Sequence, residues 1–239
     1  CIRDSYGFDL PAVTLSGLLQ QILAATGIER LRISSLQAQE ITQDLLDLWD
    51  NPRLCPHFHI PLQSGSDTIL KSMRRRYNTD QFKETVNLVR KTISDDAITT
   101  DIIVGFPEEG VKEFAESYSF AASMRFSDMH VFPYSIRPGT SAAYLDKQVD
   151  DTKKKERTGQ MLELAAMAMR EFRQASIGQI RPVLWEPARR NKLDQVWSGL
   201  TDNYLRVKAN INLGLSNTLT DTRLTGLDGD WMTGDIVPR

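Results

Sequence analysis

"HFHIPLQSGSDTILKSMRRRY", residues 57–77, changes character twice within one short stretch. Its first residues alternate between an apolar face, with Phe58, Ile60 and Leu62, and a polar face that begins at His57. Ser-Gly-Ser then supplies a turn, and a helical segment with a basic end follows. A strand that passes through a turn into a helix is the repeating unit of a parallel α/β fold.

The same pattern extends on both sides of this stretch. Apolar spacing predicts helices over 14–26, 42–50, 80–91 and 113–124, and strands over 30–35, 57–64, 97–107 and 128–135. Such alternation predicts parallel strands joined by right-handed helical crossovers. A closed eight-stranded barrel needs about 250 residues, so four strands in a chain of 239 residues predict a partial (β/α) barrel.

The pattern changes after a long predicted helix over 151–176, which Gly178 ends. The remaining residues form short alternating runs separated by Gly and Asn turns, which predicts a small all-β barrel. We therefore expect two domains, 1–176 and 177–239.

Composition limits where the chain can act. A net charge of −2 argues against a generally basic coat, so any RNA binding must be local. The two cysteines, Cys1 and Cys55, match neither a disulfide framework nor a metal or cluster motif, which indicates a reducing, cytoplasmic setting. No apolar run approaches the roughly 20 residues that span a bilayer. The chain does not begin with Met, and we expect it to be a piece of a longer protein.

Polar residues gather on the strand faces that we expect to point inward. All three histidines fall on these faces, together with Gln63 and Asp101. A single buried histidine is more commonly satisfied by its polar neighbours than used as a ligand. The group as a whole favours a binding site.

Ligands of parallel α/β folds bind at the carboxyl ends of the strands, here "QSGS", "GFPEE" and "YSIRPGT". Gly65 and Gly105 would let a flat ligand approach the backbone, and Gln63 and Ser64 can bind sugar hydroxyls. One of the arginines 74–76 can bind a carboxylate or phosphate. For Ser66 in the Ser-Gly-Ser turn, we expect a helix N-cap rather than a ligand contact, and three arginines are equally a solvated helix end.

Four stretches carry a family resemblance: "HIPLQSGSDTILKSMRRRY", "TTDIIVGFPEE", "HVFPYSIRPGT" and "GLTDNYLRV". They resemble the radical S-adenosylmethionine (SAM) methylthiotransferases, in particular the branch that acts on threonylcarbamoyladenosine beside the tRNA anticodon. The resemblance spans nearly the whole chain. It implies a radical SAM barrel followed by a TRAM-like RNA-binding barrel, and tRNA, SAM and an electron donor as partners.

The resemblance implies reductive cleavage of SAM to a 5′-deoxyadenosyl radical, hydrogen abstraction from adenine C2 and insertion of a methylthio group. Family members use two [4Fe-4S] clusters, one of them held by a CxxxCxxC loop. This chain contains no CxxxCxxC, and Cys1 and Cys55 cannot replace three thiolate ligands. We therefore expect no metal ligands in this chain and no activity from the chain alone.

Site residues follow from the inward faces and the resemblance together, with catalytic residues left unassigned. The expected SAM-binding residues are Gln63, Ser64, Arg75, Asp101, Ile103, Gly105, Val131 and Phe132. The expected substrate-binding residues are His59, His130, Tyr134, Arg137, Arg189, Arg190, Lys192, Arg206 and Lys208. Residues 177–239 hold eight Lys and Arg against seven Asp and Glu, so their charges are equally those of a soluble surface.

Two other functions remain open. The chain could be a non-catalytic RNA-binding module built on a degenerate radical SAM scaffold, which the sequence upstream of Cys1 would decide. An aldolase-like partial barrel would need a lysine or metal ligands on an inward face, and the predicted strands offer no lysine there.

Overall fold

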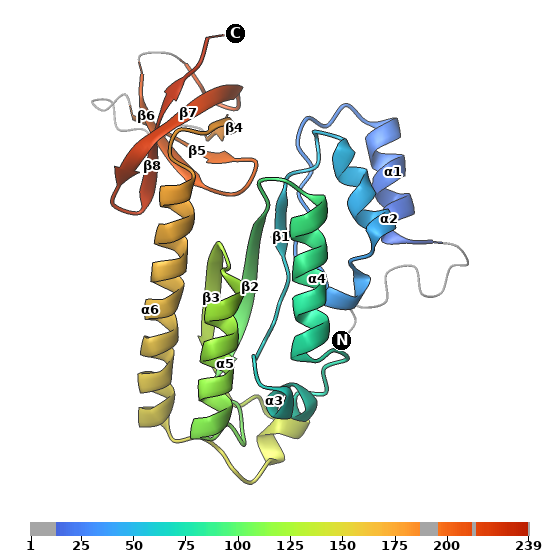
Figure 1. Cartoon of the computed structure of the whole chain (residues 1–239), viewed down its shortest axis with the longest axis vertical. Helices are drawn as coiled ribbons and strands as arrows, with labels where there is room; N and C mark the ends of the chain where they lie inside the picture. Colours follow the sequence, from blue (N-terminus) through green and yellow to red (C-terminus); the bar gives the residue numbers. More distant parts are fainter. Residues whose placement is uncertain (1–12, 187–195, 212–213, 239) are drawn as a thin grey trace.

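The computed structural model describes residues 13–186, 196–211 and 214–238. They form an elongated body with a β-barrel at one end (Figure 1). The helices are α1 (Leu15–Ala25), η2 (Ala38–Glu40), α2 (Gln43–Leu46), η3 (Asp47–Asp50), α3 (Asp67–Ser72), α4 (Thr79–Thr92), α5 (Val111–Met124), η4 (Ser141–Tyr144) and α6 (Asp151–Ala175). The strands are β1 (His57–His59), β2 (Ala97–Val104), β3 (Asp128–Pro133), β4 (Ile180–Trp185), β5 (Val196–Thr201), β6 (Arg206–Asn210), β7 (Leu219–Asp228) and β8 (Trp231–Ile236).

Strands β1, β2 and β3 form a parallel sheet in that order, as the alternation of strands and helices predicts. The apolar face of the quoted stretch is buried, with Phe58, Ile60 and Leu62 each 0% exposed. Each such side chain stabilises the fold by about 1.5–3 kcal/mol relative to an exposed one. The predicted partial parallel α/β fold is confirmed.

The predicted strand over 30–35 is wrong as a regular strand. Leu31 makes one isolated bridge to Leu54, and its amide and carbonyl bond the backbone on either side of that residue. Further along this segment, Ser35 adopts a left-handed backbone, with φ of 59°, which a regular strand does not contain. The segment is extended, but the named sheet of this part has three strands rather than four.

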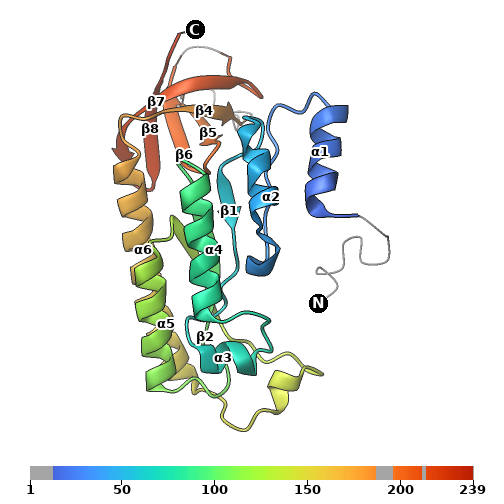
Figure 2. The ribbon, with the colours of Figure 1, turned by 45° about the vertical axis from the view of Figure 1, so that its right-hand side comes forward.

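Helices α4, α5 and α6 lie side by side over one face of the sheet (Figures 1 and 2). Their boundaries follow from local chemistry. Asn78 and Gln81 form a capping box at the start of α4, and the Asp150 carboxylate accepts the amides of Thr152 and Lys153 at the start of α6. Among the described residues, none of the helices has the length and apolar character needed to cross a membrane.

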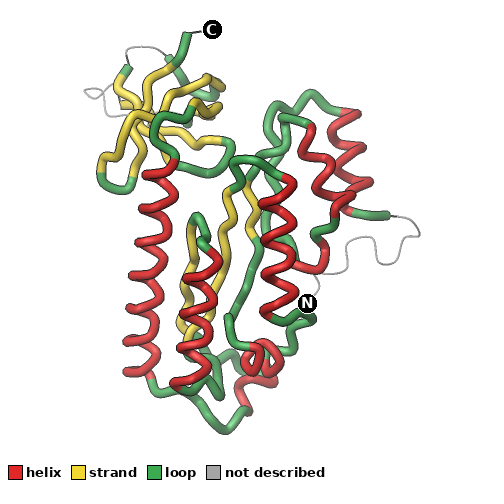
Figure 3. The backbone as a smooth tube through the Cα atoms, in the orientation of Figure 1, coloured by secondary structure: helices red, strands yellow, loops and turns green. Residues whose placement is uncertain are grey.

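The five C-terminal strands close into a barrel in the order β4-β5-β6-β8-β7, which confirms the predicted small all-β barrel. Its core includes Trp185, Val207, Leu224 and Met232, each 0% exposed. Figures 1 and 3 show this barrel at one end of the parallel sheet, with α3 and η4 at the other. The barrel therefore lies at the amino-terminal ends of the parallel strands, and α3 and η4 lie near their carboxyl ends.

The C-terminal barrel is held against the sheet by specific contacts. Arg30 donates to the carbonyl oxygens of Leu200 and Thr201, at 2.9 and 2.6 Å. The ring of Tyr204 stacks on His57, with centroids 4.6 Å apart, and the Arg32 guanidinium lies 4.4 Å from the centre of that same Tyr204 ring. His57 and Arg32 thus belong to this junction rather than to a ligand site. Arg181 adds ion pairs to Asp95 and Asp202.

Candidate functional site

The carboxyl ends of β2 and β3 border a cavity of about 570 Å³. Its lining includes six residues that the sequence predicts as site residues: Gln63, Asp101, Ile103, Phe132, Tyr134 and Arg137. Its size falls within the range of about 300–1,000 Å³ that is usual for ligand cavities. The structure thus brings together residues from three segments that the alternation argument places on inward faces.

Local backbone geometry positions these side chains. The Gln63 amide donates to the Asp101 carbonyl oxygen at 2.8 Å, which continues the parallel ladder one step beyond β1. Gln63 adopts a left-handed backbone, with φ of 69°, so the chain leaves the sheet at this point. Phe132 is 50% exposed on β3 and gives the cavity a flat apolar wall.

Asp101 is the centre of a polar cluster beside the cavity. Its Oδ1 lies 3.0 Å from His59 Nε2 and 3.2 Å from His130 Nδ1. Burial alone would raise the pKa of Asp101, but hydrogen bonds from the two histidines outweigh it and lower that pKa below its ordinary value. Asp101 is therefore a carboxylate at neutral pH.

This cluster has the spacing of a metal site, because its three ligand atoms lie within 4.8 Å of one another. The Ser35 amide, however, lies 3.2 Å from His59 Nδ1 and can only donate to it. Neutral His59 then carries its proton on Nε2, which faces Asp101 and has no lone pair for a metal. Metal-ligating histidines show the opposite arrangement, with the second nitrogen donating. The geometry favours a hydrogen-bonded cluster.

The two glycines of the carboxyl edge pack against helices. A Cβ on Gly65 would lie 2.7 Å from Phe120 Cβ and 2.9 Å from the Ser117 backbone on α5. A Cβ on Gly105, where φ is +74°, would lie 2.1 Å from Lys154 Cγ on α6. We expected these glycines to let a flat ligand approach the backbone. On the side where a Cβ atom would lie, α5 and α6 occupy that space instead, so the expectation is wrong for this side.

Other predicted SAM-binding residues lie outside the cavity lining. Ser64 is 0% exposed and accepts the Ser66 amide. Arg75 is exposed in the segment after α3, and Val131 packs against the main core. The roles of Ser64, Arg75 and Val131 toward a ligand stay predictions.

Ser66 begins α3 without a side-chain capping bond, because its hydroxyl donates to Glu116 at 2.6 Å.

Sequence reasoning missed the ion pair that holds the loop after β2. Glu109 Oε1 accepts from Arg157 Nη1 at 2.8 Å and from the Gly105 amide at 2.9 Å. Burial raises the pKa of Glu109, and these two donors oppose that shift. The paired glutamates of "GFPEE" were the available signal, but nothing in the sequence links Glu109 to a residue 48 positions later.

The predicted RNA-contacting residues divide into two groups. Arg206 and Lys208 on β6 both lie over the Trp231 ring, at 5.4 and 5.3 Å, and Lys208 also pairs with Asp228. Arg189, Arg190 and Lys192 lie outside the described residues.

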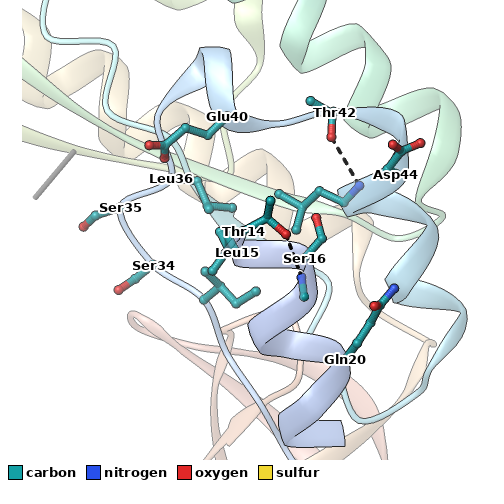
Figure 4. A pocket seen from close by; sticks show the side chains of 13 residues that line it. Thr14, Leu15, Ser16, Gln20, Ser34, Ser35, Leu36, Glu40, Thr42 and Asp44 are labelled. Carbon is teal, nitrogen blue, oxygen red and sulfur yellow. Dashed lines mark hydrogen bonds between the residues drawn. The ribbon is translucent and has the colours of Figure 1, made fainter. Parts of the chain in front are cut away.

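A larger cavity, of about 800 Å³, lies between α1 and residues 33–45 (Figure 4). It contains none of the predicted site residues. Two of its labelled side chains are helix caps, since Thr14 accepts the Gly17 amide and Thr42 accepts the Leu45 amide. Because ligands of parallel α/β folds bind at the carboxyl strand ends, we place the site in the smaller cavity.

Comparison with known proteins follows the fold. Residues 18–121 match the radical SAM superfamily. The chain is 37% identical to threonylcarbamoyladenosine tRNA methylthiotransferase MtaB of Bacillus subtilis over 205 residues, covering 84% of this chain and 46% of the relative. It is 33% identical to tRNA-2-methylthio-N(6)-dimethylallyladenosine synthase of Syntrophotalea carbinolica over 224 residues, covering 93% of this chain and 51% of the relative.

Among solved structures, coproporphyrinogen III oxidase from Escherichia coli, a radical SAM enzyme, matches with a TM-score of 0.54 and 12% identity. The match covers 78% of this chain and 50% of that one, and at this identity it shows the fold alone. The chain spans about half the length of the curated relatives it matches.

Proposed function

We propose that this chain, whose residues 18–121 match the radical SAM superfamily and which is similar to tRNA methylthiotransferases, is part of such an enzyme. The reaction is methylthiolation of a hypermodified adenosine next to the tRNA anticodon. The observation that carries this proposal is the cavity at the carboxyl strand ends, where six predicted site residues meet inside a radical SAM fold. Residues 1–176 then form the substrate-binding part of the barrel, and residues 177–239 the RNA-binding domain.

The cavity fits SAM by its chemistry. Gln63 offers an amide to sugar hydroxyls, and the Ile103 backbone lies beside the exposed Phe132 ring, a surface on which an adenine can stack. In this superfamily SAM supplies the radical that attacks an unactivated C–H bond. The chain's own residues bind and orient SAM, and they exclude water from the buried side of the cavity.

The substrate side is formed by Tyr134 and Arg137, which line the cavity, and by His130, which lies beside it next to Asp101. His130 Nδ1 lies 3.2 Å from Asp101 Oδ1, and in the tautomer that donates from Nδ1 to this carboxylate, His130 Nε2 is a hydrogen-bond acceptor. Such an acceptor suits an amino or hydroxyl group of a modified adenosine. Arg137 lines the same cavity and can bind a phosphate or carboxylate of the RNA substrate.

The described residues do not fit an iron-sulfur cluster. Cys55, the one cysteine that the structure describes, is buried beside Leu31 at the amino-terminal end of β1. No step of the reaction is therefore assigned to a cluster held by this chain. The second candidate is an RNA-binding module without catalysis, and a CxxxCxxC motif encoded upstream of Cys1 would argue against it.

The test is anaerobic reconstitution of the full-length protein with iron, sulfide, SAM, a chemical reductant and tRNA that carries the unmethylthiolated nucleoside. Mass spectrometry of the tRNA nucleosides should show a methylthio group in place of one hydrogen. tRNA binding without any methylthiolated nucleoside would support the binding module instead. We place the enzyme in the cytoplasm, with tRNA as partner and a cellular reductant as electron donor.

A further inference from the structure

A second cavity, of about 480 Å³, adjoins the candidate site. Pro133 and Tyr134 line both cavities, so the two share a wall at the end of β3. The other side of the second cavity is the first part of α6, with Asp151, Lys154, Lys155, Thr158, Gly159 and Leu162. We propose that this cavity binds a nucleotide adjoining the modified one in the RNA chain. The inference rests on the proposed function.

Two hydroxyl groups at this cavity lack partners. The Tyr134 hydroxyl and the Thr158 Oγ1 atom are buried, and neither has a hydrogen bond within the described part of the chain. A threonine in a helix usually bonds the carbonyl four residues earlier, which Thr158 does not. Because buried polar groups are almost always hydrogen-bonded, two orphans at one cavity point to a polar ligand there.

Gly159 adds a shape argument. It lies inside a 25-residue helix, where glycine is unfavourable relative to alanine. A Cβ at this position would meet nothing within 4 Å, so no packing within the described chain requires glycine. What glycine provides is a bare strip of helix facing the cavity, on which a flat ring can lie in contact with the backbone.

Charge at the cavity suits a phosphate chain. Lys153, Lys154 and Lys155 lie in the first turns of α6, where the helix dipole disfavours cations. Lys154 is paired with Asp151 at 2.7 Å, whereas Lys155 forms no ion pair within the described residues. Lys155 thus lies near two hydroxyl groups without partners, and together they suit a nucleotide. The hydroxyls of Tyr134 and Thr158 can bind the base or ribose, and Lys155 can bind the phosphate.

The test uses the full-length protein and a fluorescent tRNA anticodon stem-loop, followed by anisotropy. A second RNA lacks the base on one side of the target adenosine, and a third lacks the base on the other side. Thr158→Val and Gly159→Ala should each weaken binding of the intact RNA by about twofold to tenfold, as a neutral hydrogen bond or a close contact would. One of the abasic RNAs should bind wild type and both variants equally.

The same variants should not lose stability. Thr158→Val removes an unsatisfied hydroxyl and Gly159→Ala improves helix propensity, so the melting temperature should stay equal or rise. Lys155→Ala should flatten the slope of log affinity against log salt by about 0.7. Lys153→Ala changes a lysine in the same turn but outside the cavity lining, and it is the matched control. This variant should bind the intact RNA as tightly as the wild-type protein does.

Unchanged RNA affinity in Thr158→Val and Gly159→Ala would overturn the inference, as would equal weakening toward the intact RNA and both abasic RNAs. Lower melting temperatures with unchanged RNA affinity would also overturn it, because they would mean that protein fills the cavity. If wild type binds none of the RNAs, the proposed function itself fails, and this inference fails with it.

Discussion

His57 should make the stability of this chain depend on pH. The side chain is buried, with Tyr204 stacked on it and Nε2 placed 3.0 Å from the Thr99 hydroxyl. Burial, together with the nearby Arg32 guanidinium, lowers the pKa of His57 from 6.5 to about 3. Because the pKa of His57 is lower in the folded state, its contribution to the unfolding free energy is fully present above pH 6.5. This contribution is lost as the pH falls toward 3.

The magnitude follows from proton uptake by the unfolded chain. At pH 5 the unfolded state binds a proton at His57 and the folded state does not. The pH then lies about 1.5 units below the unfolded pKa, and each unit is worth about 1.4 kcal/mol. His57 should therefore cost the fold about 2 kcal/mol between pH 7 and pH 5. Urea denaturation at both values measures this loss.

The matched variant is His57→Phe, which keeps a ring beneath Tyr204 and cannot titrate. It leaves the Thr99 hydroxyl without its His57 partner, a cost that is the same at each pH. His59 and His130 are present in both proteins, so the difference between the two pH profiles isolates His57. Equal losses of unfolding free energy in wild type and His57→Phe would show that His57 does not cause the pH dependence.

Two further substitutions test the carboxyl edge of the sheet. Glu109→Gln should lower the unfolding free energy by about 3–5 kcal/mol, because it leaves the buried Arg157 guanidinium without its carboxylate; exposed Glu156→Gln is the control, and equal urea midpoints would contradict the expectation. Gly105→Ala should be destabilised by the overlap with Lys154 and by its left-handed φ of +74°, the latter worth about 1–2 kcal/mol. Adding Lys154→Ala should restore only the part of the stability that the overlap removes. A double variant no more stable than Gly105→Ala would argue against that overlap.

Much of the sheet could be predicted, because alternation is a local property of the sequence. Phe58, Ile60 and Leu62 had to share a face, and a one-residue slip would have exposed all three. The same argument placed Asp101 and Phe132 on faces that border one cavity. Local periodicity thus predicts which face of each strand is buried. It also predicts where the strands end, and so where the candidate site lies.

Long-range packing could not be predicted in the same way. Gly65 and Gly105 look alike in sequence whether a ligand or a helix approaches them, and only the fold shows α5 and α6 there. His57 belongs to the polar face by alternation, yet Tyr204, distant in sequence, covers it. The α6 residues of the second cavity were missed because Thr158 and Gly159 look like ordinary members of a long helix.

We propose that the full-length protein methylthiolates tRNA. This is measured by comparing tRNA nucleosides from cells with and without the intact gene by liquid chromatography and mass spectrometry. We expect that a 2-methylthio derivative of one modified adenosine disappears without the gene, that its unmethylthiolated precursor accumulates, and that the intact gene restores it. An identical nucleoside profile in both cells, in an organism with no second enzyme for the same nucleoside, would mean that the protein does not methylthiolate tRNA.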